Sequence, residues 1–328
     1  MDELPSFLPM QLMNQLTPVN QSKLISSKYM AVALSRTQRS GLLFAFLGIF
    51  AFSLSLPFTK LALKSFDPFF TAFARPVIAA VIAIPLMMIA KVPMLPRNLW
   101  KPTAFTAAGA VFGWPILIAL ALQRTTSAHV SVIAAVMPLV TAIIAVIKHK
   151  KHPGHSFWVA SSLGTVLLVA FSITRGGGTN ADLKTDLLII GAVIASSYCY
   201  VEGAALTSHM PGWQVISWVV VVSLPIALPA AAFVYAQTNA DYSFHGDALF
   251  GLLAIGLSSM YLGFFAWYRG LRDFGVAHGS QVQQLQAIMT LGWSALLLGE
   301  TVTLTMALSA IGIVLCVLWA LSNVNRVK

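Results

Sequence analysis

Ten apolar runs of about 20 residues each follow one another along the chain, and they limit its possible folds more than any other feature. A helix needs about 20 apolar residues to cross the hydrocarbon core, where lipid cannot satisfy unpaired backbone groups. Membrane β-strands are shorter and alternate in character, so unbroken runs exclude them. The sequence therefore predicts an all-α membrane protein with ten transmembrane helices. The predicted spans are 41–63, 68–90, 99–121, 127–147, 156–174, 187–207, 213–235, 248–269, 276–298 and 303–322.

The composition excludes several other classes of protein. Of the 328 residues, 58% are hydrophobic and 9% are charged, whereas a soluble domain carries about 25% charged residues. A cytosolic enzyme, a disordered chain and a disulfide-built secreted domain are therefore excluded. The net charge of +10 comes from basic residues placed between apolar runs, so we expect the lipid bilayer, and no nucleic acid, as a partner. Cys199 and Cys316 both lie inside apolar runs, which implies no disulfide framework.

The distribution of lysine and arginine predicts the orientation of the chain. If both termini are cytoplasmic, 14 of these residues lie on the inner side, and Lys60, Lys64, Arg124, Arg175 and Lys184 lie on the outer side. We therefore expect cytoplasmic tails at 1–39 and 323–328. The first tail is polar, we expect it to have little structure, and Met30 is an alternative start of translation.

An internal repeat divides the predicted membrane region. Residues 48–63 align with 191–206 without gaps at an offset of 143, and Ala128-His129 aligns with Ala277-His278 at an offset of 149. We predict two copies, at 40–175 and 183–322. Five helices per copy is an odd number, so the second copy enters the membrane from the opposite side. Inverted repeats of this kind have two near-equivalent packings, which transporters use for alternating access around a site near the midplane.

Three stretches carry a resemblance to a known family: FTAFARPVIAAVIAIPL, SAHVSVIAAVMPLVTAIIAVI and AHGSQVQQLQAIMTLGWSALLLGE. Together with the duplicated ten-helix pattern, they resemble the EamA-type branch of the drug/metabolite transporter superfamily over residues 40–322. Family members have a central proline in the fourth and ninth helices; this chain has Pro138, but Ala287 at the second position. The resemblance implies a carrier that exports amino acids or other small metabolites.

Arg75 lies about seven residues inside the second predicted helix. An ionisable group at such depth is costly, and its presence suggests a functional role. A guanidinium offers paired donors to a carboxylate, so Arg75 is a candidate substrate ligand, with Thr71 on the same helical face. The alternative is that Arg75 bonds to helix carbonyls or reaches the outer water. The repeat places Gln214 and Trp218 at the corresponding positions, and we expect both faces to line a cavity.

Glu202 is the second deep ionisable residue, and Tyr198 lies one turn away on the same face. A carboxyl group at this position could couple proton flow to export or receive a substrate amine. The alternative is a structural role in which a protonated Glu202 donates to a carbonyl.

The fourth and ninth predicted helices carry matching stripes of small and polar residues. Ser131 and Pro138 lie on the first stripe, and Gln283 lies on the second with Gln286 beside it. Close helix packing explains small residues at such spacing, but it does not explain glutamines. Four glutamines in one membrane helix need either a water-filled cavity or many hydrogen-bond partners, and we favour the cavity. The four are Gln281, Gln283, Gln284 and Gln286.

Aromatic residues and prolines complete the candidate site. Trp114 and Tyr261 lie deep enough to stack on a substrate, and Pro57 and Pro138 are candidate hinges because each removes one internal hydrogen bond. His149, His152 and His155 recur every third residue, but Pro153-Gly154 breaks their helix and no cysteine or acid accompanies them. We therefore expect no metal and no cofactor. The sequence also has no nucleophile triad or phosphate-binding loop.

These features predict a secondary active transporter of the bacterial inner membrane that acts on a small-molecule substrate. Because no nucleotide-binding domain is present in the sequence, proton coupling or exchange would drive export. An importer or exchanger of phosphorylated or nucleotide-linked sugars is the alternative within transport, although such substrates need several cations in the cavity. A non-transporting scaffold and an intramembrane enzyme are alternatives of other classes, and we find no catalytic residues for the latter.

Overall fold

The computed structural model describes residues 35–122, 124, 130, 133–150, 152–174, 183–238, 246–298 and 304–322. The chain divides into two units, 1–36 and 37–328. The helices described below belong to the second unit, except that the first of them begins at Arg36.

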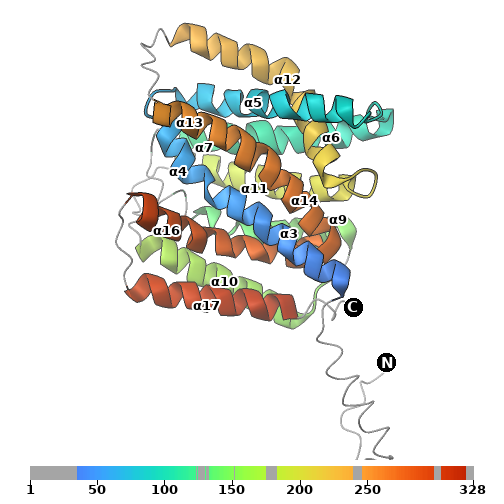
Figure 1. Cartoon of the computed structure of the whole chain (residues 1–328). Coiled ribbons are helices and arrows are strands. Elements are labelled where there is room, and N and C mark those ends of the chain that lie inside the picture. Colours follow the sequence, from blue (N-terminus) through green and yellow to red (C-terminus); the bar gives the residue numbers. More distant parts are fainter. Residues whose placement is uncertain are drawn as a thin grey trace, which may run out of the picture. The chain divides into compact units, whose positions relative to one another are not determined.

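Every regular element among the described residues is a helix (Figure 1), which confirms the predicted all-α class for this part of the chain. Helix also occupies most of the described residues of each predicted span, with turns at Leu54 and at Ala135 and Val136. The elements in chain order are α3 (Arg36–Ser53), α4 (Ser55–Ala62), α5 (Pro68–Ile89), η1 (Arg97–Leu99), α6 (Trp100–Ala107), η2 (Ala108–Gly113), α7 (Trp114–Leu122), α9 (Met137–His149), α10 (His155–Thr174), α11 (Leu183–Leu206), α12 (Gly212–Gln237), α13 (Gly246–Ala254), η3 (Ile255–Leu262), α14 (Gly263–Phe274), α15 (Val276–Gly279), η4 (Ser280–Gln284), α16 (Leu285–Leu298) and α17 (Leu304–Ser322).

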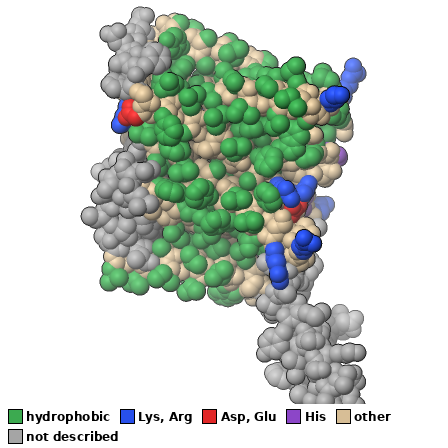
Figure 2. All heavy atoms as spheres, in the orientation of Figure 1, with side chains coloured by type: hydrophobic (Ala, Val, Ile, Leu, Met, Phe, Trp, Pro, Cys, Tyr) green, Lys and Arg blue, Asp and Glu red, His purple; other side chains and the backbone are tan. Residues whose placement is uncertain are grey.

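Five helical stretches in the described part are long and apolar enough to cross a membrane: Arg36–Thr59, Pro68–Ile89, Leu183–Leu206, Gly212–Gln237 and Gly246–Phe274. Their outward side chains are apolar. Val81, Met88 and Ile89, for example, expose more than 70% of their surface. Figure 2 shows hydrophobic side chains over most of the visible face, with lysine and arginine gathered near its edges. An apolar surface of this extent fits a lipid environment better than water.

Prolines and non-α turns interrupt several of these helices. The first helical stretch breaks at Leu54, between α3 and α4. Pro57 has no N–H to donate to the Ser53 carbonyl, because proline removes one helical hydrogen bond. Instead, that carbonyl accepts a hydrogen bond from the Thr290 hydroxyl on α16, at 3.3 Å. A bond that would lie within one helix is thus replaced by a bond between two distant segments.

The third predicted span remains helical through Trp114-Pro115, but its central turn, η2, is a π-helix. The eighth predicted span has a π-helical centre as well, η3. Such wide turns shift the helical register and are common at functional sites. The ninth predicted span consists of α15, the 3₁₀-helix η4 and α16, and three of its four glutamines lie in η4.

Helices from the two predicted repeats pack against each other throughout the described bundle. The main pairs are α5 with α12, α4 with α13, and α10 with α17. Glycine permits the close crossing of α3 and α14: a Cβ on Gly48 would lie 2.8 Å from the Trp267 backbone, and one on Gly270 would lie 2.3 Å from the Ala45 nitrogen. Small residues that bring helix backbones together are typical of membrane helix pairs.

Candidate functional site

Arg75 projects from the middle of α5 toward η3, in the other predicted repeat. Its Nη2 donates to the Ser259 hydroxyl at 3.0 Å, and Ser259 lies 3.4 Å from the Ser55 hydroxyl on α4. Its guanidinium also interacts electrostatically with Tyr200 on α11. Among the described residues, no carboxylate forms an ion pair with Arg75. One cation therefore faces hydroxyl groups from three separate segments.

Two polar atoms on this face of α5 have no hydrogen-bond partner. Arg75 Nε and Thr71 Oγ1 are both enclosed and unbonded, and Thr71 exposes only 3% of its surface. Thr71 lies one helical turn before Arg75, so the two side chains share a face. Buried polar groups are nearly always hydrogen-bonded, and an unbonded group needs an explanation. A bound polar ligand would supply both missing partners.

Aromatic rings gather beside the Arg75 group. Tyr200 stacks on Phe52 of α3 with ring centroids 6.3 Å apart, and it lies 5.4 Å from the Trp267 ring of α14. Phe264 packs edge-on to Phe52 at 5.0 Å. Trp267 Nε1 and the Tyr268 hydroxyl are buried there without a hydrogen bond. This cluster, Phe52, Tyr200, Phe264, Trp267 and Tyr268, provides an apolar surface with polar edges.

The residues predicted at the matching face of the second repeat lie on α12, which packs against α5. Trp218 is buried, whereas Gln214 is half-buried. Tyr261 on η3 is 2% exposed, and its hydroxyl lies 2.7 Å from the Ser217 hydroxyl. Tyr261 thus links η3 to α12, two residues from Ser259. The elements that carry Arg75 and Trp218 therefore pack together, and η3 joins them through Tyr261.

Glu202 occupies a different place, near the end of α11. It forms an ion pair with Lys148, the penultimate residue of α9. Glu202 is largely enclosed, while the Lys148 side chain is about a third exposed. Tyr198 lies beside them, with the Lys148 ammonium 5.9 Å from its ring centroid. The structure therefore gives Glu202 a basic partner rather than the carbonyl acceptor considered from the sequence.

The glutamines of η4 form a hydrogen-bonded network with α9 and α10. Gln281 Oε1 accepts from Ser161 at 2.9 Å and from Gln284 Nε2 at 2.8 Å. Gln283 Nε2 lies 2.8 Å from the Met137 sulfur, and the Pro138 carbonyl accepts from Ser280 at 3.3 Å. Gln281 and Gln284 are fully buried. For Gln281 the expectation of a water-filled cavity was wrong, because Ser161 on α10 and Gln284 in η4 supply its partners. Gln284 Oε1 is enclosed without a hydrogen-bond partner.

The remaining predicted site residues are more scattered. Trp114 packs with Leu117 and Leu188 in a cluster between α7 and α11. Gln286 is half-buried at the start of α16. Pro57 follows the break between α3 and α4, and Pro138 begins α9. Ser131 lies outside the described residues. Among the described residues, no hydrogen bond or ion pair joins Arg75 to Glu202 or to the glutamine network.

The sequence pointed to Arg75 and Glu202 but not to the residues that form hydrogen bonds or ion pairs with them. Ser259, Ser55, Lys148 and Tyr200 were not candidates. Serines in apolar runs are too common to stand out. The Ser259 hydroxyl also donates to the carbonyl of Ile255, one helical turn earlier, at 3.1 Å. A search of the described residues finds no group of three or more His, Cys, Asp or Glu side chains able to hold a metal ion.

An apolar outer surface, several helices fit to span a membrane, and an enclosed arginine with unbonded neighbours define a multi-pass membrane protein of the transporter class. Comparison with known families identifies it further. The chain belongs to the EamA-like transporter family, whose model matches residues 39–173 and again residues 183–322.

One relative supports this assignment, and a solved structure shares the fold. The chain is 36% identical over 279 residues to a Bacillus subtilis (strain 168) protein named "Uncharacterized transporter YdeK", covering 85% of this chain and 96% of that protein. A solved crystal structure that is 16% identical superposes with a TM-score of 0.70 and covers 86% of this chain and 96% of its own. At that level of identity, the second likeness shows the fold alone.

Proposed function

We propose that this protein is a secondary transporter of the bacterial inner membrane that works by alternating access. In this proposal, ten helices form two inverted five-helix repeats, at 40–175 and 183–322, with both termini in the cytoplasm. The double match of the family model supports the division into repeats. The excess of basic residues in the predicted inner loops supports the orientation. An inverted repeat has two related packings that can each open to one side.

The proposed substrate is an amino acid or a related small metabolite, which the protein exports. The observation that carries this proposal is the partner-less face of α5, where Arg75 Nε and Thr71 Oγ1 are enclosed but unbonded. A substrate carboxylate fits there, because a guanidinium binds a carboxylate through paired charge-assisted hydrogen bonds. The aromatic cluster beside it would contact the apolar part of the substrate. Gln214, Trp218 and Tyr261 would complete the site from the second repeat.

Glu202 is the proposed proton-coupling group, with Tyr198 beside it. Its ion pair with Lys148 joins α11 to α9, that is, one predicted repeat to the other. Protonation of Glu202 would remove the negative charge that holds Lys148 and would loosen this link. A proton could thereby favour one of the two packings, because a ligand shifts an equilibrium only through its different affinity for the two states. Exchange of one substrate for another is the alternative source of energy.

The proposal also assigns two hinges and a set of residues along the substrate path. Pro57 and Pro138 are the proposed hinges, and the break between α3 and α4 supports the first. Trp114, Ser131, Gln283 and Gln286 are proposed to line the substrate path in some packing of the helices. For Gln283, an enclosed oxygen without a hydrogen-bond partner supports such a role.

Transport by the purified protein in liposomes tests this proposal. Proteoliposomes would be loaded with a panel of labelled amino acids and related metabolites, and efflux would be measured with and without a pH gradient. We expect efflux of at least one carboxylate-bearing compound that responds to the gradient or to an exchange substrate outside. Properly folded protein that moves none of these compounds under either condition would contradict the proposed function.

A further inference from the structure

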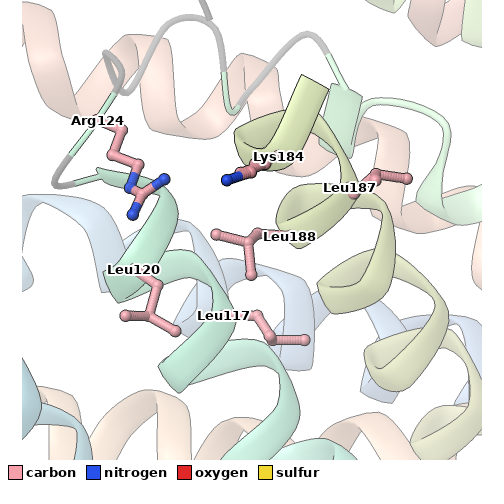
Figure 3. Close-up of a pocket in the computed structure, with 6 residues that line it drawn as sticks. All are labelled: Leu117, Leu120, Arg124, Lys184, Leu187 and Leu188. Atoms are coloured by element: carbon pink, nitrogen blue, oxygen red, sulfur yellow. The ribbon is translucent and has the colours of Figure 1, made fainter. Parts of the chain in front are cut away.

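A groove between the end of α7 and the start of α11 lies apart from the Arg75 group. It has a volume of about 450 Å³ and is lined by Leu117, Leu120, Arg124, Lys184, Leu187 and Leu188. Figure 3 shows the Arg124 guanidinium and the Lys184 ammonium pointing toward one another across its mouth, with Leu117, Leu120 and Leu188 below them. The groove is therefore cationic at one end and apolar beneath.

The two cations approach each other without a nearby anion among the lining residues. Like charges that converge repel one another, and the described residues include no ion pair or hydrogen bond to either charged group. Asp186 lies two residues from Lys184 but does not line the groove. An anion in the mouth of the groove would contact both cations and relieve this repulsion.

The position of the groove along its helices specifies the kind of anion. Arg124 lies two residues after α7, which ends at Leu122, and Lys184 is the second residue of α11. Both cations are exposed, and α11 is a stretch fit to span a membrane. Cations at the ends of membrane helices lie at the level of the lipid headgroups, while the leucines one and two turns further in lie at the level of the acyl chains.

We propose that this groove is a binding site for an anionic phospholipid. The phosphodiester of the headgroup lies between Arg124 and Lys184, and the acyl chain follows Leu120, Leu117 and Leu188 along the seam of α7 and α11. Both features are needed: a free anion would use the cations but leave the leucines uncovered, and a neutral lipid would do the reverse. The site is distinct from the proposed substrate site, which lies on α5, α12 and η3.

Lipid binding measured by native mass spectrometry tests this proposal. The protein in detergent would be mixed with phosphatidylglycerol and phosphatidylcholine of identical chains, and the bound amounts would be compared. A basic side chain near a membrane surface favours an anionic lipid by about fivefold. We expect a clear preference for phosphatidylglycerol, reduced about fivefold by Arg124→Gln, and by a similar factor by Lys184→Gln. Equal binding of the two lipids by the unmodified protein would overturn the proposal.

Lys64→Gln is the matched control, because it removes one exposed lysine from the same predicted side of the membrane. Lys64 is already paired with Asp247, with 2.6 Å between Nζ and Oδ2, so the preference for phosphatidylglycerol should be unchanged. A loss equal to that of the groove variants would indicate only a general charge effect and would contradict the proposal. Glycerol 3-phosphate distinguishes the sources of the anion: if it displaces the lipid at equal concentration, the groove binds free phosphate esters rather than lipid.

Discussion

Two polar regions lie inside the apolar bundle, and they differ in how their hydrogen bonds are satisfied. The Arg75 group on α5 and η3 contains a guanidinium nitrogen and a threonine hydroxyl without partners. The glutamine network of η4, α9 and α10 is more deeply buried, and Ser161, Gln281 and Gln284 each bond to another member. Its unbonded atoms, Gln283 Oε1 and Gln284 Oε1, are neutral amide oxygens. Both regions connect segments that are far apart in sequence.

This difference separates a candidate binding site from a structural element. Burying a polar group is costly unless a hydrogen bond compensates it. In the glutamine network the protein itself provides most of that compensation, so the network specifies how η4 packs. Around Arg75 the compensation is incomplete, so a partner from outside the chain would complete it. A missing partner on a charged group costs more than one on a neutral group, so the Arg75 group, rather than the glutamine network, is the site at which a substrate is expected.

The largest expected effect comes from Arg75→Gln. We expect carboxylate efflux from proteoliposomes to fall by about ten- to hundredfold, because a hydrogen bond to a charged group contributes about 1.5–3 kcal/mol. The protein should still fold, since Arg75 has no ion pair to lose among the described residues. Arg272→Gln is the matched control: it removes an arginine that pairs with Asp273 at the surface and should leave efflux unchanged. Equal efflux by all three proteins would mean that Arg75 does not bind the substrate.

Gln281→Leu tests the other side of the comparison. This change leaves the Ser161 hydroxyl and the Gln284 amide without their main partner, so we expect a loss of about 1–3 kcal/mol in the free energy of unfolding. Unfolding in a mixed detergent measures it, and efflux per folded molecule should stay within about twofold. Gln286→Leu should do the opposite, lowering efflux while preserving stability. A stable Gln281→Leu protein with impaired efflux would reverse the roles assigned to the two regions.

Glu202→Gln provides a test of an ion pair that belongs to neither region. The amide retains the shape of the carboxyl group but cannot change its charge, so we expect efflux to lose its response to the pH gradient while exchange persists. The rate under a gradient should then equal the rate without one. Lys148→Gln is the companion variant, which removes the cation and leaves the titratable group. A pH response that survives in Glu202→Gln would show that coupling occurs elsewhere.

Much of the fold could be predicted because the bilayer fixes the length of its helices. Most described residues of the apolar runs are helical, and Arg75 stood out as the one arginine deep inside such a run. Thr71 followed from helical periodicity alone. Each of these inferences depends on a single segment of the chain, and local sequence carries that information.

The hydrogen-bond and ion-pair partners of the polar residues could not be predicted, because they depend on which helices pack together. Lys148 is 54 residues from Glu202 and lies at the end of a helix, where a lysine ordinarily suggests contact with water. Ser161 is 120 residues from Gln281, so the sequence could not show this partner and favoured a cavity over a network for the glutamines. Packing decided between them, and packing is not visible in the periodicity of one helix.

Thr71→Val is the smallest and most discriminating change, because it predicts opposite signs for stability and transport. The Thr71 hydroxyl is buried without a partner, so replacing it with a methyl group removes a desolvation cost and should leave stability equal or slightly higher. If the substrate supplies the missing partner, efflux should fall about two- to tenfold, the value of one neutral hydrogen bond. Thr103→Val is matched in chemistry, since Thr103 Oγ1 on α6 is also buried and unbonded, and it should not alter efflux. Equal efflux by both variants would make the unbonded Thr71 a feature of packing and would leave Arg75 as the only substrate ligand on α5.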